Sequence, residues 1–450
     1  MNHGTRRRFL QGVISTPLIG AGAAFAAAPQ PQIIGPRSPV KDAIRTEVLV
    51  VGAGASGVPA ALAAARSGAK VILIEEDAVP GGAPVDMFVS MICGGPVVGI
   101  YGEMMAMLDR DFDLDNKQGT IAEGRWFAPS AYVHVISRML RAEPNVDLWC
   151  AAPATDVLIS EGGRNRVRGV VVRRPGQPPR AIEADVVIDA SGSAVVAALA
   201  GCECRYGTEA RSEFNEPLGP KTSSDTVQLC TLMLLHQRLR SDAQIDHRQL
   251  GGSMSVPSHE NNAVLHWAGT VRCSDTRDPV AIAKAHQEAI EKVETIVDYA
   301  YRCGYVAHMA PKLGVRESCR VVGDHVLSVN DLIRPERPED TVALGSYRLD
   351  SWGDSHGGAA GRTHLDLTPG GYGIPLPTLW VRGFDNLMVV GKCLSATHLA
   401  QSAVRVQCIV AQMGQAGGIA AALAVAKQTD LRSLPVREIQ TRLKATGIPL

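Results

Sequence analysis

Apolar residues form a short run at 47–52, EVLVVG, and the chain then passes through the glycine-rich turn GAGASG. The segment that follows, PAALAAARSGAK, carries its apolar residues at helical spacing until Gly68. A second apolar run, VILIEED, ends in acidic residues. The pattern therefore predicts a buried strand, a tight turn, a helix and a second buried strand, which is how an α/β fold begins.

Strand and helix patterns return farther along the chain. Two β-rich stretches, 154–159 and 166–173, precede the strand ADVVIDASGS at 184–193 and predict a meander inserted in the sheet. Residues 386–391 predict another strand, and a long helix rich in glycine and alanine follows from about Ser402. Small side chains allow such a helix to pass close to another backbone.

The middle of the chain has a different pattern. Asp278 and Pro279 form an N-cap and first-turn pair, and apolar residues then recur at helical spacing until Gly304. Residues 222–235 predict a buried strand. We therefore expect an α/β protein in which an α+β substrate domain is inserted into a Rossmann-like domain. The expected parts are a signal 1–26, a linker 27–45, the Rossmann-like domain 46–205 and 366–430, the inserted domain 206–365, and a tail 431–450.

The first glycine turn indicates a dinucleotide site. Gly52 would make the turn, Gly54 would let the backbone approach a pyrophosphate, and Gly57 would let the helix lie against the strand. Glu75, at the end of the second strand, would accept hydrogen bonds from ribose hydroxyls. A second glycine turn that ends at Gly82 favours FAD over NAD, because simple NAD dehydrogenases do not need it.

The N-terminus has the features of an export signal. Residues 5–12, TRRRFLQG, contain adjacent arginines and precede a weakly apolar run that is too short for a confident membrane span. Ala24 and Ala26 supply a small-x-small cleavage pattern, so we expect cleavage after Ala26. This predicts a periplasmic or otherwise exported protein that folds around its cofactor before twin-arginine export. An uncleaved signal that tethers the protein stays an alternative.

Composition narrows the choice of partners. The chain has 450 residues, with 45 Lys and Arg against 45 Asp and Glu. A nucleic-acid or anionic-membrane partner would require a basic excess, so we expect neither, and no membrane span in the mature chain. Aromatic residues make up only 4% of the chain, which disfavours an aromatic-rich sugar groove. The expected partners are a small-molecule substrate and an unknown electron acceptor.

Further segments carry a resemblance to a known family. They are LGVRESCRVVGDHVLSVNDL at 313–332, the Asp-rich segment around Asp340 and Asp350, and DNLMVVGKCLSATH with SAVRVQ and MGQAGG. Together with the glycine turns, they resemble the FAD-dependent oxidoreductase family that groups with the FAD subunit of heterodisulfide reductase. That resemblance implies a glutathione-reductase-type FAD fold. It also implies that the ribityl and flavin end is bound by Gly391, Ser395 and Arg405.

The chain departs from the family pattern at several positions. Cys319 stands where the family has the first of two arginines, and Trp352 stands where it has the histidine of an Asp-x-His sequence. Lys392 replaces an arginine, and Ser193 replaces an aspartate. Positions 319 and 352 fall where the resemblance implies contacts with the substrate. The identity of the substrate therefore stays open.

Catalytic candidates must exchange a proton while hydride moves to or from a flavin. His398 follows the flavin-binding motif, and His364 lies in a glycine-rich loop. Arg316 and Arg320 would clamp a carboxylate or another oxygen-rich substrate. A structural hydrogen-bonding role for His398, and an ion pair of the arginines with Glu317 or Asp324, stay open as alternatives.

The cysteines do not predict an iron–sulfur cluster. The chain has 10 cysteines with no C-x2-C-x2-C run, although a cluster built from scattered cysteines stays open, as do disulfides. No paired zinc-ligand spacing stands out, so we assign no metal. The expected cofactor is FAD, held non-covalently, with a covalent link to His398 or Cys393 as the alternative.

These features predict an exported FAD-dependent oxidoreductase that transfers hydride between a small organic substrate and an electron acceptor of the cell envelope. Two alternatives stay open. One is a lyase or isomerase in which the flavin is non-redox or only transiently reduced. The other is an electron-transfer flavoprotein subunit with a protein partner.

Overall fold

The computed structural model describes most of the chain after the N-terminal segment. The expected signal 1–26, nearly all of the linker and His364 lie outside the described residues. The structure describes residues 43–112, 126–160, 166–250, 255–257, 263–353, 367–368 and 370–450.

A seven-stranded sheet forms the base of the fold, in the order β3-β2-β1-β6-β5-β4, with β15 also paired to β6. The strands β1, β2, β3, β6 and β15 run parallel, whereas β4, β5 and β6 form an antiparallel meander. The α/β fold with a parallel, Rossmann-like sheet is therefore confirmed. The strand bounds are β1 Ile44–Val51, β2 Val71–Ile74, β3 Val146–Trp149, β4 Ala154–Ile159, β5 Val167–Val172, β6 Arg180–Asp189 and β15 Leu387–Val389.

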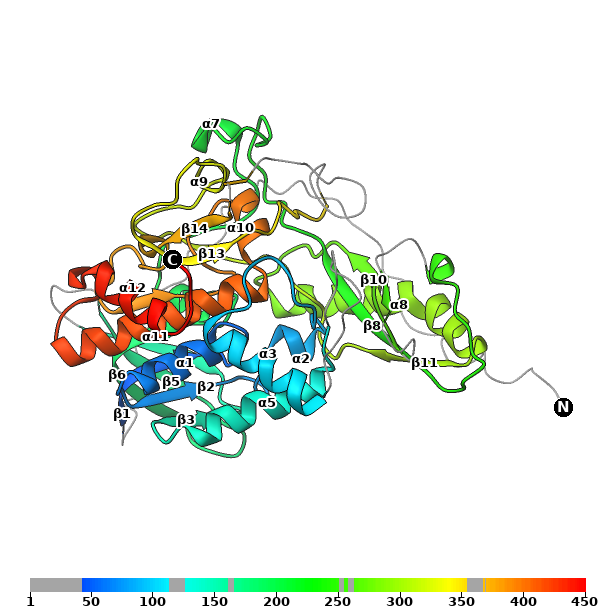
Figure 1. The fold of residues 1–450 in the computed structure, drawn as a ribbon, viewed down its shortest axis with the longest axis horizontal. Helices are drawn as coiled ribbons and strands as arrows, with labels where there is room; N and C mark the ends of the chain where they lie inside the picture. The colour runs from blue at the N-terminus through cyan, green and yellow to red at the C-terminus, as the bar shows by residue number, and fades with distance from the viewer. Residues whose placement is uncertain are drawn as a thin grey trace, which may run out of the picture. The chain divides into compact units, whose positions relative to one another are not determined.

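Two helices cross each other closely on this sheet, α1 (Gly57–Arg66) and α11 (Gln407–Lys427) (Figure 1). A Cβ atom at Gly414 would lie 2.0 Å from the carbonyl oxygen of Ser56, and one at Gly418 would lie 2.1 Å from that of Ala60. Only glycine permits this backbone contact. The expected role of the glycine-rich helix in close packing is therefore seen directly.

The C-terminal helix expected from Ser402 is two helices rather than one. The first, α10 (His398–Val404), is capped by Thr397, whose hydroxyl accepts a hydrogen bond from the Ala400 amide at 3.2 Å. The backbone turns extended at Val406 (ψ 154°) before α11 starts. Because of this break, Arg405, the C-cap residue of α10, lies at the edge of a cavity and not on the face of a continuous helix.

A second sheet of four strands, which we call the cap sheet, has the order β11-β8-β10-β9. The amphipathic helix α8 lies along it, away from the large sheet in Figure 1. The Asp278 carboxylate caps α8 by accepting from the amides of Val280 and Ala281, as the sequence predicts. The strand predicted at 222–235 starts later than expected, at Cys230. The bounds are β8 Cys230–Arg238, β9 Ser255–Pro257, β10 Ala263–Val271, β11 Tyr305–Met309 and α8 Pro279–Arg302.

Part of the segment assigned to the inserted domain lies in the main core instead. The pair β13 (Thr341–Gly345) and β14 (Tyr372–Pro375) buries Val342 and Tyr372 in the same apolar cluster as α1 and α11. The expected tail contains helix α12 (Val436–Ala445), which buries Ile439 and Leu443 in that cluster. Burial of these apolar faces joins both segments to the core.

The remaining helices, strands and 3₁₀ turns complete the described fold. They are α2 Ala83–Asp86, α3 Gly99–Phe112, α5 Pro129–Ala142, α6 Val195–Leu199, β7 Cys204–Arg205, α7 Arg211–Phe214, β12 Arg320–Val321, α9 Val329–Leu332 and the 3₁₀ turns His247–Leu250, Leu376–Thr378 and Leu431–Ser433.

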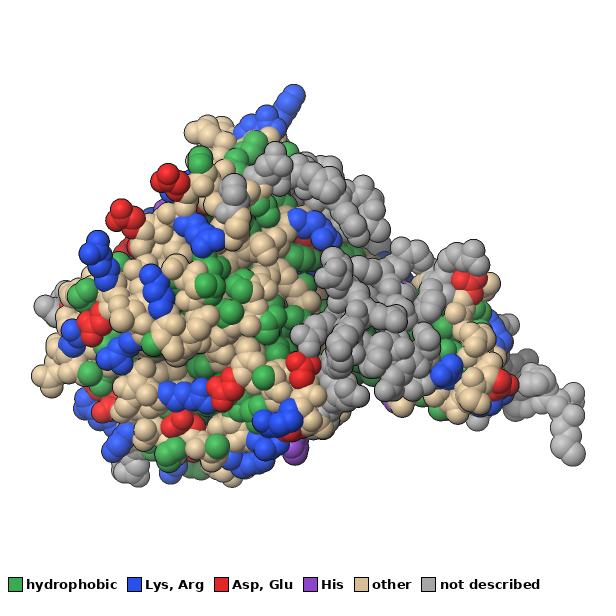
Figure 2. Space-filling model, in the orientation of Figure 1, with side chains coloured by type: hydrophobic (Ala, Val, Ile, Leu, Met, Phe, Trp, Pro, Cys, Tyr) green, Lys and Arg blue, Asp and Glu red, His purple; other side chains and the backbone are tan. Residues whose placement is uncertain are grey.

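The face of the molecule in Figure 2 carries charged side chains of both signs, interspersed over the surface. Among the described helices, α11 has the length and hydropathy that a membrane span would need. It is also a core helix, because 94% of its most apolar stretch is buried inside the fold.

Candidate functional site

A cavity of about 300 Å³ opens at the carboxyl ends of the parallel strands. Gly52 follows β1, Glu75 follows β2 and Ala190 follows β6, and all three residues line it. Ligands of open α/β sheets bind at this edge. The cavity extends to the cap sheet, where Thr231 and Trp267 line its other end.

The glycine turn after β1 has the shape that the spacing predicts. Gly52 has a φ of +99°, and a Cβ atom at Gly57 would lie 1.8 Å from the Gly52 carbonyl oxygen. Gly54 and Gly82 pack against each other in the cavity wall, since a Cβ at Gly82 would lie 3.0 Å from the Gly54 Cα. The absence of side chains here leaves backbone amides and the start of α1 open to an anionic group.

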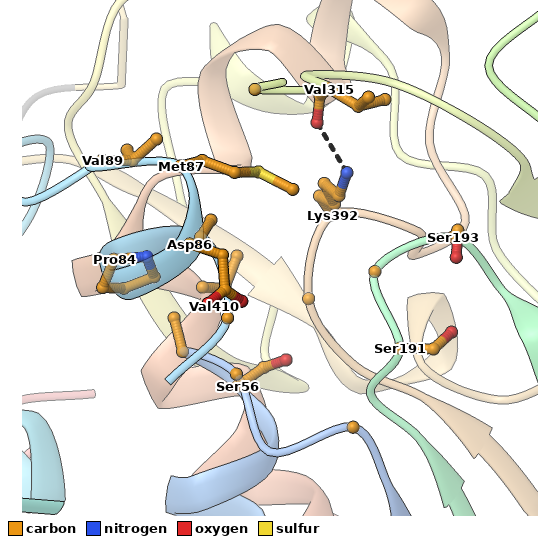
Figure 3. Close-up of a pocket in the computed structure, with 18 of the residues that line it drawn as sticks. Ser56, Pro84, Asp86, Met87, Val89, Ser191, Ser193, Val315, Lys392 and Val410 are labelled. Carbon is orange, nitrogen blue, oxygen red and sulfur yellow. Dashed lines mark hydrogen bonds between the residues drawn. The ribbon is translucent and has the colours of Figure 1, made fainter. Parts of the chain in front are cut away.

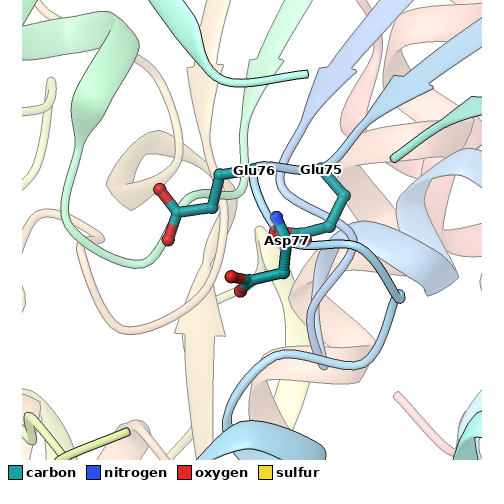
Figure 4. Close-up of side chains that lie close together, drawn as sticks. All are labelled: Glu75, Glu76 and Asp77. Carbon is teal, nitrogen blue, oxygen red and sulfur yellow. Dashed lines mark hydrogen bonds between the residues drawn. The ribbon is translucent and has the colours of Figure 1, made fainter. Parts of the chain in front are cut away.

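Glu75 is held in place by backbone groups. Its carboxylate accepts hydrogen bonds from the amides of Ala53 (2.6 Å) and Asp77 (3.1 Å). Burial raises the pKa of Glu75, and these two amides oppose that rise. Figure 4 shows the carboxylate of the next residue, Glu76, directed to the other side of the chain. Both glutamates line the cavity, but Glu75 is buried and Glu76 is exposed.

Acidic side chains gather near this end of the cavity. Within the described ranges, Glu75, Glu76 and Asp77 form the one group of three whose oxygens lie close enough to share a metal ion. The Lys312 ammonium already pairs with Glu76 (3.2 Å) and Asp77 (2.5 Å), so we assign no metal there. Burial, together with the charge of Asp77, raises the pKa of the nearby Asp86 to about 7.

The cap end of the cavity is organised around Asp350. Its carboxylate accepts from the Trp352 indole at 3.0 Å and from the Tyr347 hydroxyl at 3.2 Å. The Arg405 guanidinium donates to the Asp350 carbonyl at 3.0 Å and lies 3.4 Å from its carboxylate. Burial opposes ionisation of Asp350, but Arg405 and its other partners lower its pKa overall.

Two further cations line the cavity. Arg316 donates to the Leu229 carbonyl (2.8 Å) and the Thr231 hydroxyl (2.7 Å), and its guanidinium lies 4.0 Å from the centre of the Trp352 ring. Burial, with the repulsion of Arg405, lowers the pKa of Arg316 to about 9. Lys392 donates to the Val315 carbonyl at 2.6 Å, as Figure 3 shows, and burial lowers its pKa as well.

The end of the cavity at the glycine turns has the polar groups that FAD requires. The glycine turns provide a surface of bare backbone at one end, and Glu75 lies beside it as a ribose acceptor. A separate ligand group is indicated at the cap end, where Nε of Arg405 is buried with no hydrogen-bond partner among the described residues. A buried donor of this kind is expected to bind a ligand group.

A model of the family described as FAD dependent oxidoreductase matches residues 47–443. The chain belongs to this FAD dependent oxidoreductase family. It is thus an oxidoreductase enzyme, and FAD is its cofactor. A comparison with curated proteins finds no match.

The solved structures to which this chain is similar have low sequence identity to it. A geranylgeranyl bacteriochlorophyll reductase-like protein of Thermoplasma acidophilum is 15% identical, with a TM-score of 0.43, covering 90% of this chain and 84% of that chain. The myxobacterial chondrochloren halogenase CndH is 14% identical, with a TM-score of 0.41, covering 89% and 78%. The p-nitrophenol 4-monooxygenase PnpA of Pseudomonas putida is 11% identical, with a TM-score of 0.41, covering 89% and 84%. Similarities this weak carry no argument about the substrate.

The cofactor-binding residues expected from the sequence fall into two groups. One group lines the cavity: Gly52, Gly54, Glu75, Gly82, Gly391 and Arg405. The other does not. Gly57 lies where α1 meets β1, and Ser395 is 1% exposed beneath Gly323, away from the cavity.

The catalytic candidates divide in the same way. Arg316 lines the cavity, whereas His398 and Arg320 are 2% and 0% exposed and lie outside its lining. His398 contacts the Glu317 carboxylate through Nδ1 (2.7 Å) and the Ser351 hydroxyl through Nε2 (2.8 Å). The structural hydrogen-bonding role that the sequence left open for His398 is the one seen here.

Arg320 belongs to the same buried charge network, which we define as Glu209, Glu317, Arg320, Ser351 and His398. The Arg320 guanidinium lies 3.0 Å from Glu317 and 2.7 Å from Glu209. The ion pair with Glu317, an alternative at the sequence level, is therefore present, and Arg320 does not reach the cavity as the substrate clamp that we expected. Burial opposes ionisation of Glu317, but His398 and Arg320 lower its pKa overall.

Several cavity residues were missed or recognised only in part from the sequence. Lys392 and Trp352 stood out only as departures from the family pattern. Thr231 and Trp267 had no local signal, because they reach the cavity only when the cap sheet folds over it. The sequence also did not predict that Lys312 forms ion pairs with Glu76 and Asp77.

We expect Glu75→Gln to weaken FAD binding by about 10-fold or more, because a charged acceptor contributes about 1.5–3 kcal/mol to such hydrogen bonds. The measurement is the dissociation constant of FAD for the apoprotein, from quenching of flavin fluorescence. Glu47→Gln is the matched control, because the Glu47 carboxylate also accepts from a backbone amide (Lys70, 2.6 Å) but does not line the cavity, and it should leave the constant unchanged. Equal effects of the two substitutions would contradict the assigned role of Glu75.

We expect Glu317→Gln to lower the free energy of unfolding by about 3–5 kcal/mol, since it removes the carboxylate that contacts His398 and one of the two that pair with the buried Arg320. Denaturant unfolding of the FAD-loaded protein measures this change. The control is Glu183→Gln, which removes a surface ion pair with Arg168 and should cost less than about 1 kcal/mol. A small effect at Glu317 would show that the buried charge network contributes little to stability.

Proposed function

We propose that this enzyme is exported and transfers hydride between a small organic substrate and an electron acceptor of the cell envelope. The observation that carries the proposal is the single cavity that joins the glycine turns to the cap sheet. A FAD bound along the glycine turns leaves the cap end, with Thr231, Met233 and Trp267, to the substrate.

The residues at the cap end supply binding and proton chemistry. FAD, when bound, supplies the site that accepts or donates hydride. Trp267 and Met233 exclude water from the reacting carbon, which strengthens the electrostatic interactions around it. Hydride removal from an alcohol or amine carbon also releases a proton. Lys392 is our candidate to hold that proton, because burial lowers its pKa and so favours the neutral amine that can accept a proton, and its Nζ is fixed by a hydrogen bond to the Val315 carbonyl.

Export is supported by sequence features outside the described residues. Adjacent arginines at 6–8 precede a weakly apolar run and an Ala-x-Ala pattern. An exported enzyme has little access to free NAD(P)H. An envelope electron carrier or quinone is therefore the acceptor that fits this location best.

The redox proposal is tested by anaerobic bleaching of the flavin absorbance in protein that starts at residue 27. We expect some small alcohols, amines or acids of a substrate panel to bleach it, and a soluble quinone to restore the colour faster than NAD(P)+ does. The variant Lys392→Met should bleach about 100-fold more slowly with the same substrate. Repeated turnover without any acceptor would instead indicate a lyase or isomerase. Reduction by a redox protein alone would indicate an electron-transfer subunit.

Export has its own test in a bacterium that carries the twin-arginine pathway. The full chain should appear in the periplasm with FAD bound, and the triple variant Arg6→Lys, Arg7→Lys, Arg8→Lys should stay in the cytoplasm. Fractionation followed by immunoblotting and flavin fluorescence gives the readout. Equal distribution of the two proteins would contradict the export proposal.

A further inference from the structure

The cap end of the cavity holds more positive than negative charge. Arg316, Lys392 and Arg405 all line it, and Asp350 is the one carboxylate of this end that lines it with them. Among the described residues, Asp350 forms an ion pair with Arg405, whereas Arg316 and Lys392 form none. The charge of Arg316, and that of Lys392 whenever it is protonated, is therefore not balanced by a carboxylate among the described residues.

This excess contrasts with the interior a few residues away. In the buried charge network, Arg320 contacts two carboxylates, Glu209 and Glu317. Burial of a charged group without a partner is costly, and proteins balance such groups where they serve structure alone. The imbalance at the cavity thus indicates that an anion from outside the chain completes it.

The donors at this end are fixed rather than mobile. The Arg316 guanidinium lies 4.0 Å from the Trp352 ring centre, and the Trp352 indole binds Asp350. Asp350 in turn holds Arg405. Only one terminal nitrogen of Arg316 is used, in bonds to Leu229 and Thr231. Its remaining N–H groups and the unpartnered Nε of Arg405 are available to a ligand.

We propose that the substrate is a small organic carboxylate whose carboxylate group binds Arg316 and Arg405 while its apolar part lies against Trp267 and Met233. This proposal rests on the proposed function and specifies its substrate class. Planar guanidinium groups suit carboxylates because they offer paired donors. The pyrophosphate of FAD is expected at the opposite end of the cavity, at Gly54 and Gly82.

The test uses FAD-loaded protein and three pairs of an acid with its neutral amide. The pairs are acetate and acetamide, benzoate and benzamide, and phenylacetate and phenylacetamide. Dissociation constants come from perturbation of the flavin spectrum and, independently, from calorimetry. We expect at least one acid to bind at least 10-fold more tightly than its amide.

The Arg316→Gln variant should weaken binding of that acid by about 10- to 100-fold, as expected for a charge-assisted hydrogen bond. Arg316→Lys, which keeps the charge, should recover part of the loss. The matched control is Arg277→Gln. Arg277 also lies 4.0 Å from an aromatic ring centre, that of Tyr206, but it pairs with Asp275 and does not line the cavity. It should leave binding unchanged.

Three results would overturn the proposal: equal binding of every acid and its amide, no binding of any acid, or unchanged acid binding in Arg316→Gln. It also fails if Arg316→Gln loses FAD while its acid affinity, measured by calorimetry, is retained, because the cations then serve the cofactor. Failure of the protein to bind FAD would instead contradict the cofactor assignment. The calorimetric comparison of acids with amides still decides the anion site in that case.

Discussion

The contact between α1 and α11 is the constraint on which the site depends. These helices touch backbone to backbone, since Cβ atoms at Gly414 and Gly418 would overlap with carbonyl oxygens of Ser56 and Ala60. Ser56 lies in the glycine turn, and Arg405 lies two residues before α11 begins at Gln407. A wider helix separation would therefore move the dinucleotide turn away from the cationic end of the same cavity.

The wall of the cavity is supported by charges that never reach it. Ser351 lies between Asp350 and Trp352, and its hydroxyl is bound to His398. Glu317, next to Arg316 in sequence, holds the other side of the His398 ring. These contacts fix the orientation of the groups at the cap end. The charges of the buried charge network are paired with one another and support the wall from within. Arg316, which has no carboxylate partner among the described residues, faces the cavity.

Local sequence patterns were sufficient wherever the structure depends on neighbouring residues. The strand, glycine turn, helix and acidic residue around Gly52 and Glu75 form one continuous unit, and the pairing of β1 with β2 and the bond from the Ala53 amide to Glu75 lie within it. The cap of α8 by Asp278 is equally local. Both follow from backbone geometry and side-chain chemistry over a few residues, so periodicity and residue type predicted them without knowledge of the fold.

The sequence by itself thus determined the α/β class, the dinucleotide turn and the FAD family, because these depend on short-range spacing. Only the tertiary structure decided which polar residues face the cavity. His398 and Arg320 are enclosed by Glu317 and Glu209, whereas Arg316, Lys392 and Trp352 line the cavity. Whether a residue faces the cavity or lies in the buried charge network depends on contacts between segments far apart in the chain. The spacing of residues along the sequence does not encode those contacts.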